Sequence, residues 1–271
     1  MTPPIGSAAR LWPAAAALGL IAAAPGDRRV PSVDLAPFAT RSPWRLIVSR
    51  AADLPDPIMG DGEQVPGVLR LCLTADGGRT CDIRPGASLR LADAPDLYDE
   101  PHELRRLAIV PSAGGKRLLL IQLASLAGAN GDQRVGLELY AYDRAGDRFR
   151  SVYQGRTRQN NNQELRYIEG GALRGAVVAA EPTNDAPFGY WITVARAGAT
   201  GAYRSVLRYR SATRYGDGNP LAVIDSEMPA LQQRLVLWRP GRPLPVPAHC
   251  AAPRLVRMEL WCGAPPVDVA R

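Results

Sequence analysis

The sequence contains very little lysine and histidine. Lys116 is the single lysine among 33 lysines and arginines, and His102 and His249 are the two histidines. The formal net charge is +7, but the arginines are dispersed among apolar residues, as in Leu-Arg-Leu at 69–71. This pattern is typical of solvated strand faces, whereas a surface that stacks nucleic-acid bases needs basic residues interleaved with aromatic rings. We therefore expect no nucleic-acid partner.

Motifs of the common catalytic and cofactor-binding sites are also missing. The chain has no GxSxG, HExxH, Walker-type or GxGxxG pattern. Its four cysteines have no CxxC spacing, which disfavours a metal site. We therefore expect no cofactor and no metal ion.

Carboxylates are the remaining candidates for catalysis. Asp217, Asp225 and Glu227 lie in the polar segment YGDGNPLAVIDSEMP. Two carboxylates about 5 to 10 Å apart can hydrolyse a glycosidic bond, so a secreted carboxylate-dependent hydrolase is one hypothesis. The alternative is that Asp-Gly-Asn-Pro forms a turn and that Ser226 caps a short helix with Glu227 in its first turn.

His102 has acidic neighbours, because it follows Asp99 and Glu100 closely. Such a histidine can act as a base that a carboxylate orients. The alternative is a solvated loop residue, which is the more common role for a histidine in a polar connection.

Long hydrophobic runs are absent after the N-terminus. The run from Leu11 to Ala24 is shorter than the ~20 residues that span a bilayer, and Pro13 interrupts it. We predict a cleaved signal peptide at 1–24, with a short membrane anchor as the alternative, and an irregular lead-in at 25–43. The mature protein is then periplasmic or secreted and has no membrane span.

Export places the four cysteines in an oxidising compartment, where disulfides persist. Cys72 and Cys81 flank Asp-Gly at 76–77, a strong signal for a two-residue hairpin turn that would place the two cysteines opposite each other. A four-residue loop at 75–78 would keep the same facing pair. Cys250 and Cys262 then pair with each other across a segment that contains an alternating strand from 255 to 261. This connectivity is one of the three that four cysteines allow.

Two stretches in the middle of the chain resemble each other. Phe-Arg-Ser-Val at 149–152 matches Tyr-Arg-Ser-Val at 203–206, and Gly-Gly at 114–115 matches Gly-Gly at 170–171. Each stretch contains four segments with the alternation and the β-branched and aromatic content of strands. The predicted strands are 104–110, 117–124, 135–143 and 148–154 in the first unit, and 164–168, 173–180, 190–196 and 203–210 in the second.

The expected fold is therefore all-β, built from consecutive four-stranded antiparallel meanders with one short C-terminal helix. A small β-propeller-like arrangement is the leading architecture, and a β-sandwich is the alternative. Strands at 44–50 and 68–83 could belong to a third unit. We expect a single domain at 44–262, with repeat units near 104–155 and 164–211, and a tail at 263–271.

The polar loop between the two units is a candidate binding segment. Gln159, Asn160, Asn161 and Asn162 form the most polar uncharged run, and they could hydrogen-bond a ligand or serve only as a connector. The aromatic residues at 188–191 would strengthen a binding site if exposed, although packing between sheets is their expected role. The leading hypothesis is a non-catalytic binding or scaffolding module of the bacterial envelope, with a glycan or an envelope protein as the partner class.

Overall fold

The computed structural model of the chain describes residues 33–57, 62–90, 96, 98–158, 162–247, 250 and 252–263. Several predictions concern residues outside this part. They are the leader, the start of the lead-in, Gln159, Asn160, Asn161, and all of the tail after Gly263.

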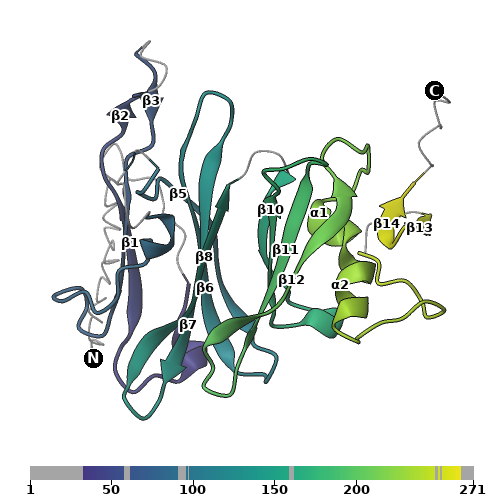
Figure 1. The fold of residues 1–271 in the computed structure, drawn as a ribbon. Coiled ribbons are helices and arrows are strands. Elements are labelled where there is room, and N and C mark those ends of the chain that lie inside the picture. Colours follow the sequence, from purple (N-terminus) through teal and green to yellow (C-terminus); the bar gives the residue numbers. More distant parts are fainter. Residues whose placement is uncertain are drawn as a thin grey trace, which may run out of the picture.

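The middle of the chain forms two consecutive four-stranded antiparallel sheets (Figure 1). Every strand pairs with the next one in sequence, so each sheet is a meander, as predicted. The first meander contains β5 (Glu103–Pro111), β6 (Arg117–Ala127), β7 (Gln133–Asp143) and β8 (Arg148–Arg158). The second meander contains β9 (Glu164–Tyr167), β10 (Val177–Pro182), β11 (Gly189–Ala197) and β12 (Tyr203–Arg214).

The predicted strand at 173–180 begins later than expected, at Val177. The short 3-10 helix η4 (Gly171–Leu173) occupies its predicted start. Gly175 follows with a φ of +80°, and a Cβ atom at this position would lie 2.3 Å from the backbone nitrogen of Ala113. Only glycine fits this close approach between the two meanders, and its left-handed backbone delays the strand.

The N-terminal part contributes two smaller sheets and two 3-10 helices. β1 (Arg45–Arg50) pairs with β4 (Leu69–Thr74), and β2 (Leu54–Pro55) pairs with β3 (Gln64–Val65). The 3-10 helices are η1 (Ala36–Phe38), inside the predicted irregular lead-in, and η2 (Ala87–Leu89). Of the predicted strand segment 68–83, regular strand is formed from Leu69 to Thr74.

The disulfide between Cys72 and Cys81 is present, with the two Cα atoms 5.4 Å apart. The predicted two-residue hairpin is wrong, because Leu73 pairs with Ile83 in an isolated bridge. Asp76 explains the difference. Its carboxylate accepts hydrogen bonds from the backbone nitrogens of Gly78 and Thr80, and these bonds shape a wider loop.

The described residues of the C-terminal part form two short helices where one was predicted. They are α1 (Val223–Ser226) and α2 (Met228–Arg234). Ser226 therefore ends the first helix and does not cap the second, whose N-cap residue is Glu227.

The predicted strand at 255–261 is a hairpin of β13 (Pro253–Val256) and β14 (Glu259–Cys262). Arg257 and Met258 both have positive φ angles and form its tight turn. The disulfide between Cys250 and Cys262 is present as predicted.

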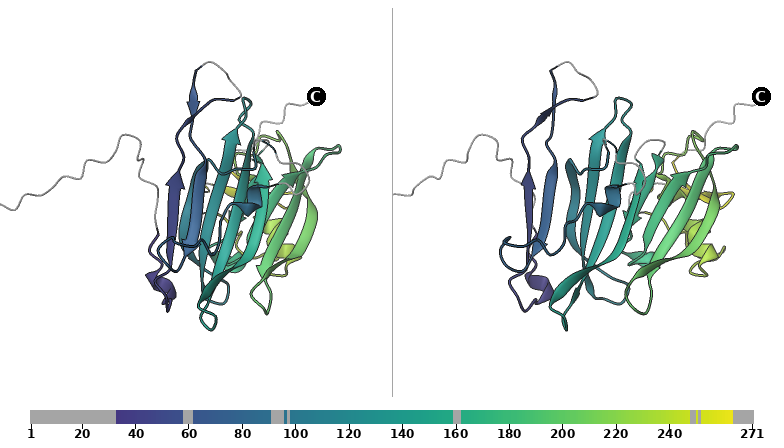
Figure 2. Two further views of the ribbon diagram at one scale, coloured as in Figure 1. Left: turned by 90° about the vertical axis from the view of Figure 1, so that its left-hand side faces the viewer. Right: turned by 60° about the vertical axis from the view of Figure 1, so that its left-hand side comes forward.

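The sheets stack as layers (Figure 2). Leucines of β4 pack on one face of β6, and residues of the other face of the first meander pack against the second meander. The far face of the second meander is covered by α1 and α2. Adjacent propeller blades and β-sandwiches both stack sheets face to face in this way. The strands of the described residues form open sheets and no closed barrel.

Candidate functional site

One face of β10 and β11 changes from apolar to polar and aromatic along its length. Val177 and Ala195 are paired in the register and are buried in the core between the two meanders. The pair four residues further along is Glu181 and Trp191. Alternate residues of a strand share a face, so a surface that begins as an apolar contact continues as a polar and aromatic one.

This polar part of the face borders a cavity of about 530 Å³, which we call the inter-sheet cavity. It is lined by Arg158, Gln163, Glu181, Pro182, Asn184, Trp191 and Arg208. The guanidinium carbon of Arg208 lies 4.5 Å from the centroid of the Trp191 ring, so this cation stacks on the indole. The lining combines one large aromatic ring with amide, carboxylate and guanidinium groups.

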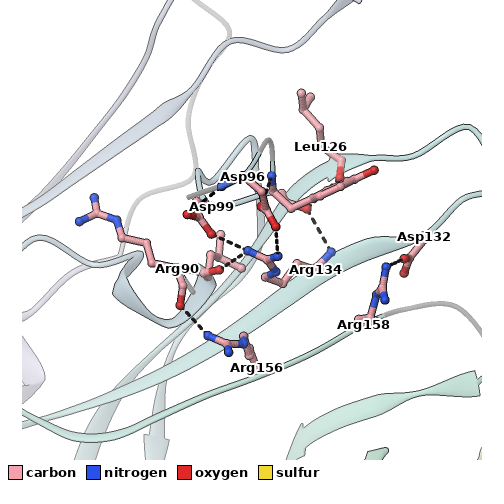
Figure 3. Close-up of polar contacts among 11 residues, drawn as sticks. Arg90, Asp96, Asp99, Leu126, Asp132, Arg134, Arg156 and Arg158 are labelled. Atoms are coloured by element: carbon pink, nitrogen blue, oxygen red, sulfur yellow. Dashed lines mark hydrogen bonds and ion pairs between the residues drawn. The ribbon is translucent and has the colours of Figure 1, made fainter. Parts of the chain in front are cut away.

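An ion pair and two hydrogen bonds hold the part of the lining formed by Arg158 and Gln163. The guanidinium of Arg158 forms an ion pair with the buried carboxylate of Asp132 (Figure 3). The backbone nitrogen of Arg158 donates to the side-chain oxygen of Gln163 at 3.2 Å, and the hydroxyl of Thr157 donates to the same oxygen at 3.3 Å. The end of β8 and the residue before β9 are therefore tied together across the connecting loop.

The lining holds two arginines and one glutamate, and the charge of Arg158 is already paired with that of Asp132. The negative charge of Glu181 also acts on the hydroxyl of Tyr153, which lies on β8. Burial raises the pKa of the Tyr153 hydroxyl to about 12, and repulsion from Glu181 contributes to this shift. The cavity is thus a charged environment bordered by a low-dielectric core.

The predicted polar binding loop begins and ends at this cavity. Arg158 and Gln163 flank the loop, and both line the cavity. Within the loop the structure describes Asn162, which is exposed and has a φ of +57°. The sequence alone pointed to the loop but not to Glu181 and Arg208. These residues lie near Trp191 because of how β10, β11 and β12 pair, and the register of that pairing cannot be read from the sequence.

The three aromatic residues near the cavity have different environments. Tyr190 is buried in the core between the second meander and the helices, as expected for packing. Phe188 is 62% exposed, contrary to the expectation that it packs between sheets. Trp191 is partly exposed and lines the cavity. Only Trp191 therefore combines access to solvent with polar neighbours.

The predicted catalytic carboxylates are held by protein groups. Asp225 forms an ion pair with Arg166, with 2.6 Å between Oδ1 and Nη1. Glu227 has no exposed surface, and it accepts hydrogen bonds from the hydroxyls of Tyr209 at 2.8 Å and Thr213 at 2.6 Å.

Asp217, the third predicted carboxylate, accepts a hydrogen bond from the backbone nitrogen of Asn219 at 2.8 Å, as expected for a turn residue. Catalysis by the three carboxylates stays a prediction. Glu227 is fully buried, so its carboxylate could not touch a substrate in this conformation.

Glu259 is a further carboxylate in this region that sequence reasoning missed. It lies on β14, is 7% exposed and borders a smaller cavity. Burial raises the pKa of its carboxyl to about 7, and the negative charges of Asp217 and Glu227 add to the shift. Nothing in the local sequence signals this, because the three residues are brought together by the packing of the hairpin on the helices.

His102 is buried, contrary to the interpretation as a solvated loop residue. Its side chain is 5% exposed, and its Nδ1 atom lies 2.6 Å from the backbone oxygen of Pro66. Among the residues that the structure describes, no group of three or more histidine, cysteine or acidic side chains is arranged to hold a metal ion.

The helices of the described part of the chain are all too short or too polar to cross a membrane. Comparisons with known protein families, with curated proteins and with solved structures find no match for this chain.

Proposed function

We propose that this protein is a non-catalytic binding module of the bacterial envelope and that the inter-sheet cavity holds a saccharide. The observation that carries the proposal is the surrounding of Trp191 by planar polar side chains on one face of a rigid sheet. A sugar ring offers an apolar C–H face to an aromatic ring and a rim of hydroxyl groups to amides, carboxylates and guanidinium groups. The lining of the cavity supplies both kinds of contact.

The arginines of the cavity favour an acidic saccharide. Arg158 is paired with Asp132, so Arg208 is the cation that we assign to the ligand, and a guanidinium can bind a carboxylate through two parallel hydrogen bonds. Arg208 is held over Trp191, so a sugar stacked near this ring would carry its carboxylate within reach of a fixed cation. A uronic-acid unit combines these features.

Location outside the cytoplasm belongs to the same proposal. The two disulfides are typical of proteins in oxidising compartments. The predicted signal peptide would direct the chain to the periplasm or the medium. We also propose that the two meanders are repeats. The two Gly-Gly pairs precede the second strand of each meander, and the matching Arg-Ser-Val segments lie in the fourth strand.

Binding measurements on the Trp191→Ala variant test the proposed function. We expect the intact protein to bind an oligogalacturonate more tightly than its neutral galactose counterpart, in titration calorimetry. Loss of the indole should weaken binding about tenfold or more, which corresponds to ~1.4 kcal/mol. Phe188→Ala is the matched control, because Phe188 is an exposed aromatic residue close in sequence that does not line the cavity.

Three outcomes would contradict the proposal. Equal binding by the Trp191→Ala variant and the intact protein would remove the cavity as the site. Equal affinity for acidic and neutral oligosaccharides would remove the role assigned to the arginines. Absence of binding to every member of a panel of acidic and neutral envelope oligosaccharides would end the proposal as a whole.

A further inference from the structure

A larger cavity, of about 650 Å³, lies between the β2–β3 hairpin and the first meander, and it shares no lining residue with the inter-sheet cavity. We call it the His102 cavity. Its apolar wall is formed by Leu54, Pro55, Pro57, Val65, Val68 and Leu126. A wall of this kind can hold an aliphatic chain, because each buried CH₂ group contributes about 0.8 kcal/mol.

His102 presents one basic nitrogen to this cavity. A carbonyl oxygen can only accept a hydrogen bond, so the Nδ1 atom of His102 carries the proton that is donated to Pro66. In the neutral ring, Nε2 is then the acceptor. Among the described residues Nε2 has no hydrogen-bond partner, and it is not one of the buried polar atoms closed off from solvent. A side chain that is 5% exposed therefore keeps an unused acceptor toward the cavity that it lines.

Acidic side chains form the opposite part of the lining. Asp96, Asp99 and Glu100 contribute three carboxylates, and Arg90 contributes one cation. Figure 3 shows the guanidinium of Arg134 between Asp96 and Asp99, at 2.7 Å and 2.6 Å from their oxygens. A single arginine is thus shared by two carboxylates, while Glu100 remains exposed. Arg50 also lies beside the cavity, because its Nη1 atom donates to the backbone oxygen of His102 at 3.0 Å. Among the described residues, Glu100 is the carboxylate of this lining that forms no ion pair.

We propose that the His102 cavity binds a primary aliphatic ammonium group together with the alkyl chain that carries it. The ammonium donates one hydrogen bond to Nε2 of His102 and lies in the field of Glu100, Asp96 and Asp99. The chain packs on the apolar wall. A neutral or anionic head group fits less well, since it leaves the Glu100 carboxylate without a counter-charge and an anion would be repelled by it.

Titration of the full chain with three six-carbon probes tests this proposal. The probes are hexylammonium, hexan-1-ol and hexanoate, and binding is followed by NMR chemical shifts at pH 8, where an alkylamine is charged. We expect hexylammonium to bind about tenfold more tightly than hexan-1-ol and hexanoate to bind more weakly still. The resonances that move should include the His102 imidazole.

Variants separate the head-group contacts from the wall. Glu100→Gln should weaken hexylammonium binding about fivefold and leave hexan-1-ol unchanged, and the exposed Glu100 tolerates this change without loss of folding. Glu103→Gln is the matched control, because Glu103 does not line the cavity. Val68→Trp should abolish the binding of all three probes by filling the cavity.

Three results would overturn the inference. They are equal binding of the ammonium and the alcohol, an unchanged affinity in Glu100→Gln, and binding that persists in Val68→Trp. The inference is independent of the proposed saccharide site, because Trp191→Ala should leave hexylammonium binding intact.

Discussion

At the scale of single residues, the most buried carboxylates are stabilised by neutral donors. Glu138 has no exposed surface. It accepts hydrogen bonds from the backbone nitrogens of Gly86 at 3.0 Å and Ser88 at 2.8 Å, and from the hydroxyl of Tyr140. These bonds fasten η2 to β7. Glu227 likewise accepts hydrogen bonds from two side chains of β12, those of Tyr209 and Thr213. Both carboxylates therefore have a structural role that their positions in the sequence do not reveal.

The Glu138→Gln variant tests this structural role. Glutamine keeps the shape of the side chain, but it replaces one acceptor oxygen by an NH₂ group that faces donors. We expect the free energy of unfolding to fall by about 2 kcal/mol, because a buried donor is left without a partner. Urea denaturation measures the change. Glu63→Gln is the control at an exposed site, and an equal loss in both variants would show that the network around Glu138 contributes nothing specific.

At the scale of elements, the β13–β14 hairpin carries a titrating group into the packed C-terminal region. Burial, with repulsion from Asp217 and Glu227, raises the pKa of Glu259 from 4.5 to about 7. A raised carboxyl pKa means that the folded state holds the proton more tightly than the unfolded state. The stabilisation is therefore complete below pH 4.5 and is lost as the pH rises to about 7.

The Glu259→Gln variant should remove this pH dependence. A shift from 4.5 to about 7 corresponds to a contribution on the order of 3 kcal/mol. Relative to the variant, the intact protein should lose stability by about this amount between pH 4.5 and pH 8, in urea unfolding at several pH values. Parallel pH profiles of the two proteins would contradict the environment that we describe for Glu259.

At the scale of the whole molecule, the parts that sequence reasoning found are local ones. The eight strands of the two meanders and both disulfides follow from alternation, turn residues and spacing within short stretches. The layered stacking, the two cavities and the partners of His102 and Glu259 could not be predicted in this way. They depend on contacts between residues far apart in sequence, and neither hydrophobic periodicity nor composition encodes which faces meet.

The location of the two disulfides predicts how the whole molecule responds to reduction. The Cys72–Cys81 and Cys250–Cys262 bonds join residues 9 and 12 positions apart, and each lies outside the two meanders, which are built from β5 to β12. Loops of this length reduce the entropy of the unfolded chain by an amount worth about 3 kcal/mol each.

Treatment with a phosphine reductant should therefore shift the urea midpoint downward while the far-ultraviolet circular dichroism spectrum of the sheets is retained in water. The double variants Cys72→Ser/Cys81→Ser and Cys250→Ser/Cys262→Ser should each reproduce part of the shift, and the two losses should add because the bonds lie in separate elements. Peptide mapping of the purified protein without reduction should recover both linked pairs. Four free thiols in that protein, or complete unfolding on reduction, would show that the meanders do not hold the fold in the way their buried cores indicate.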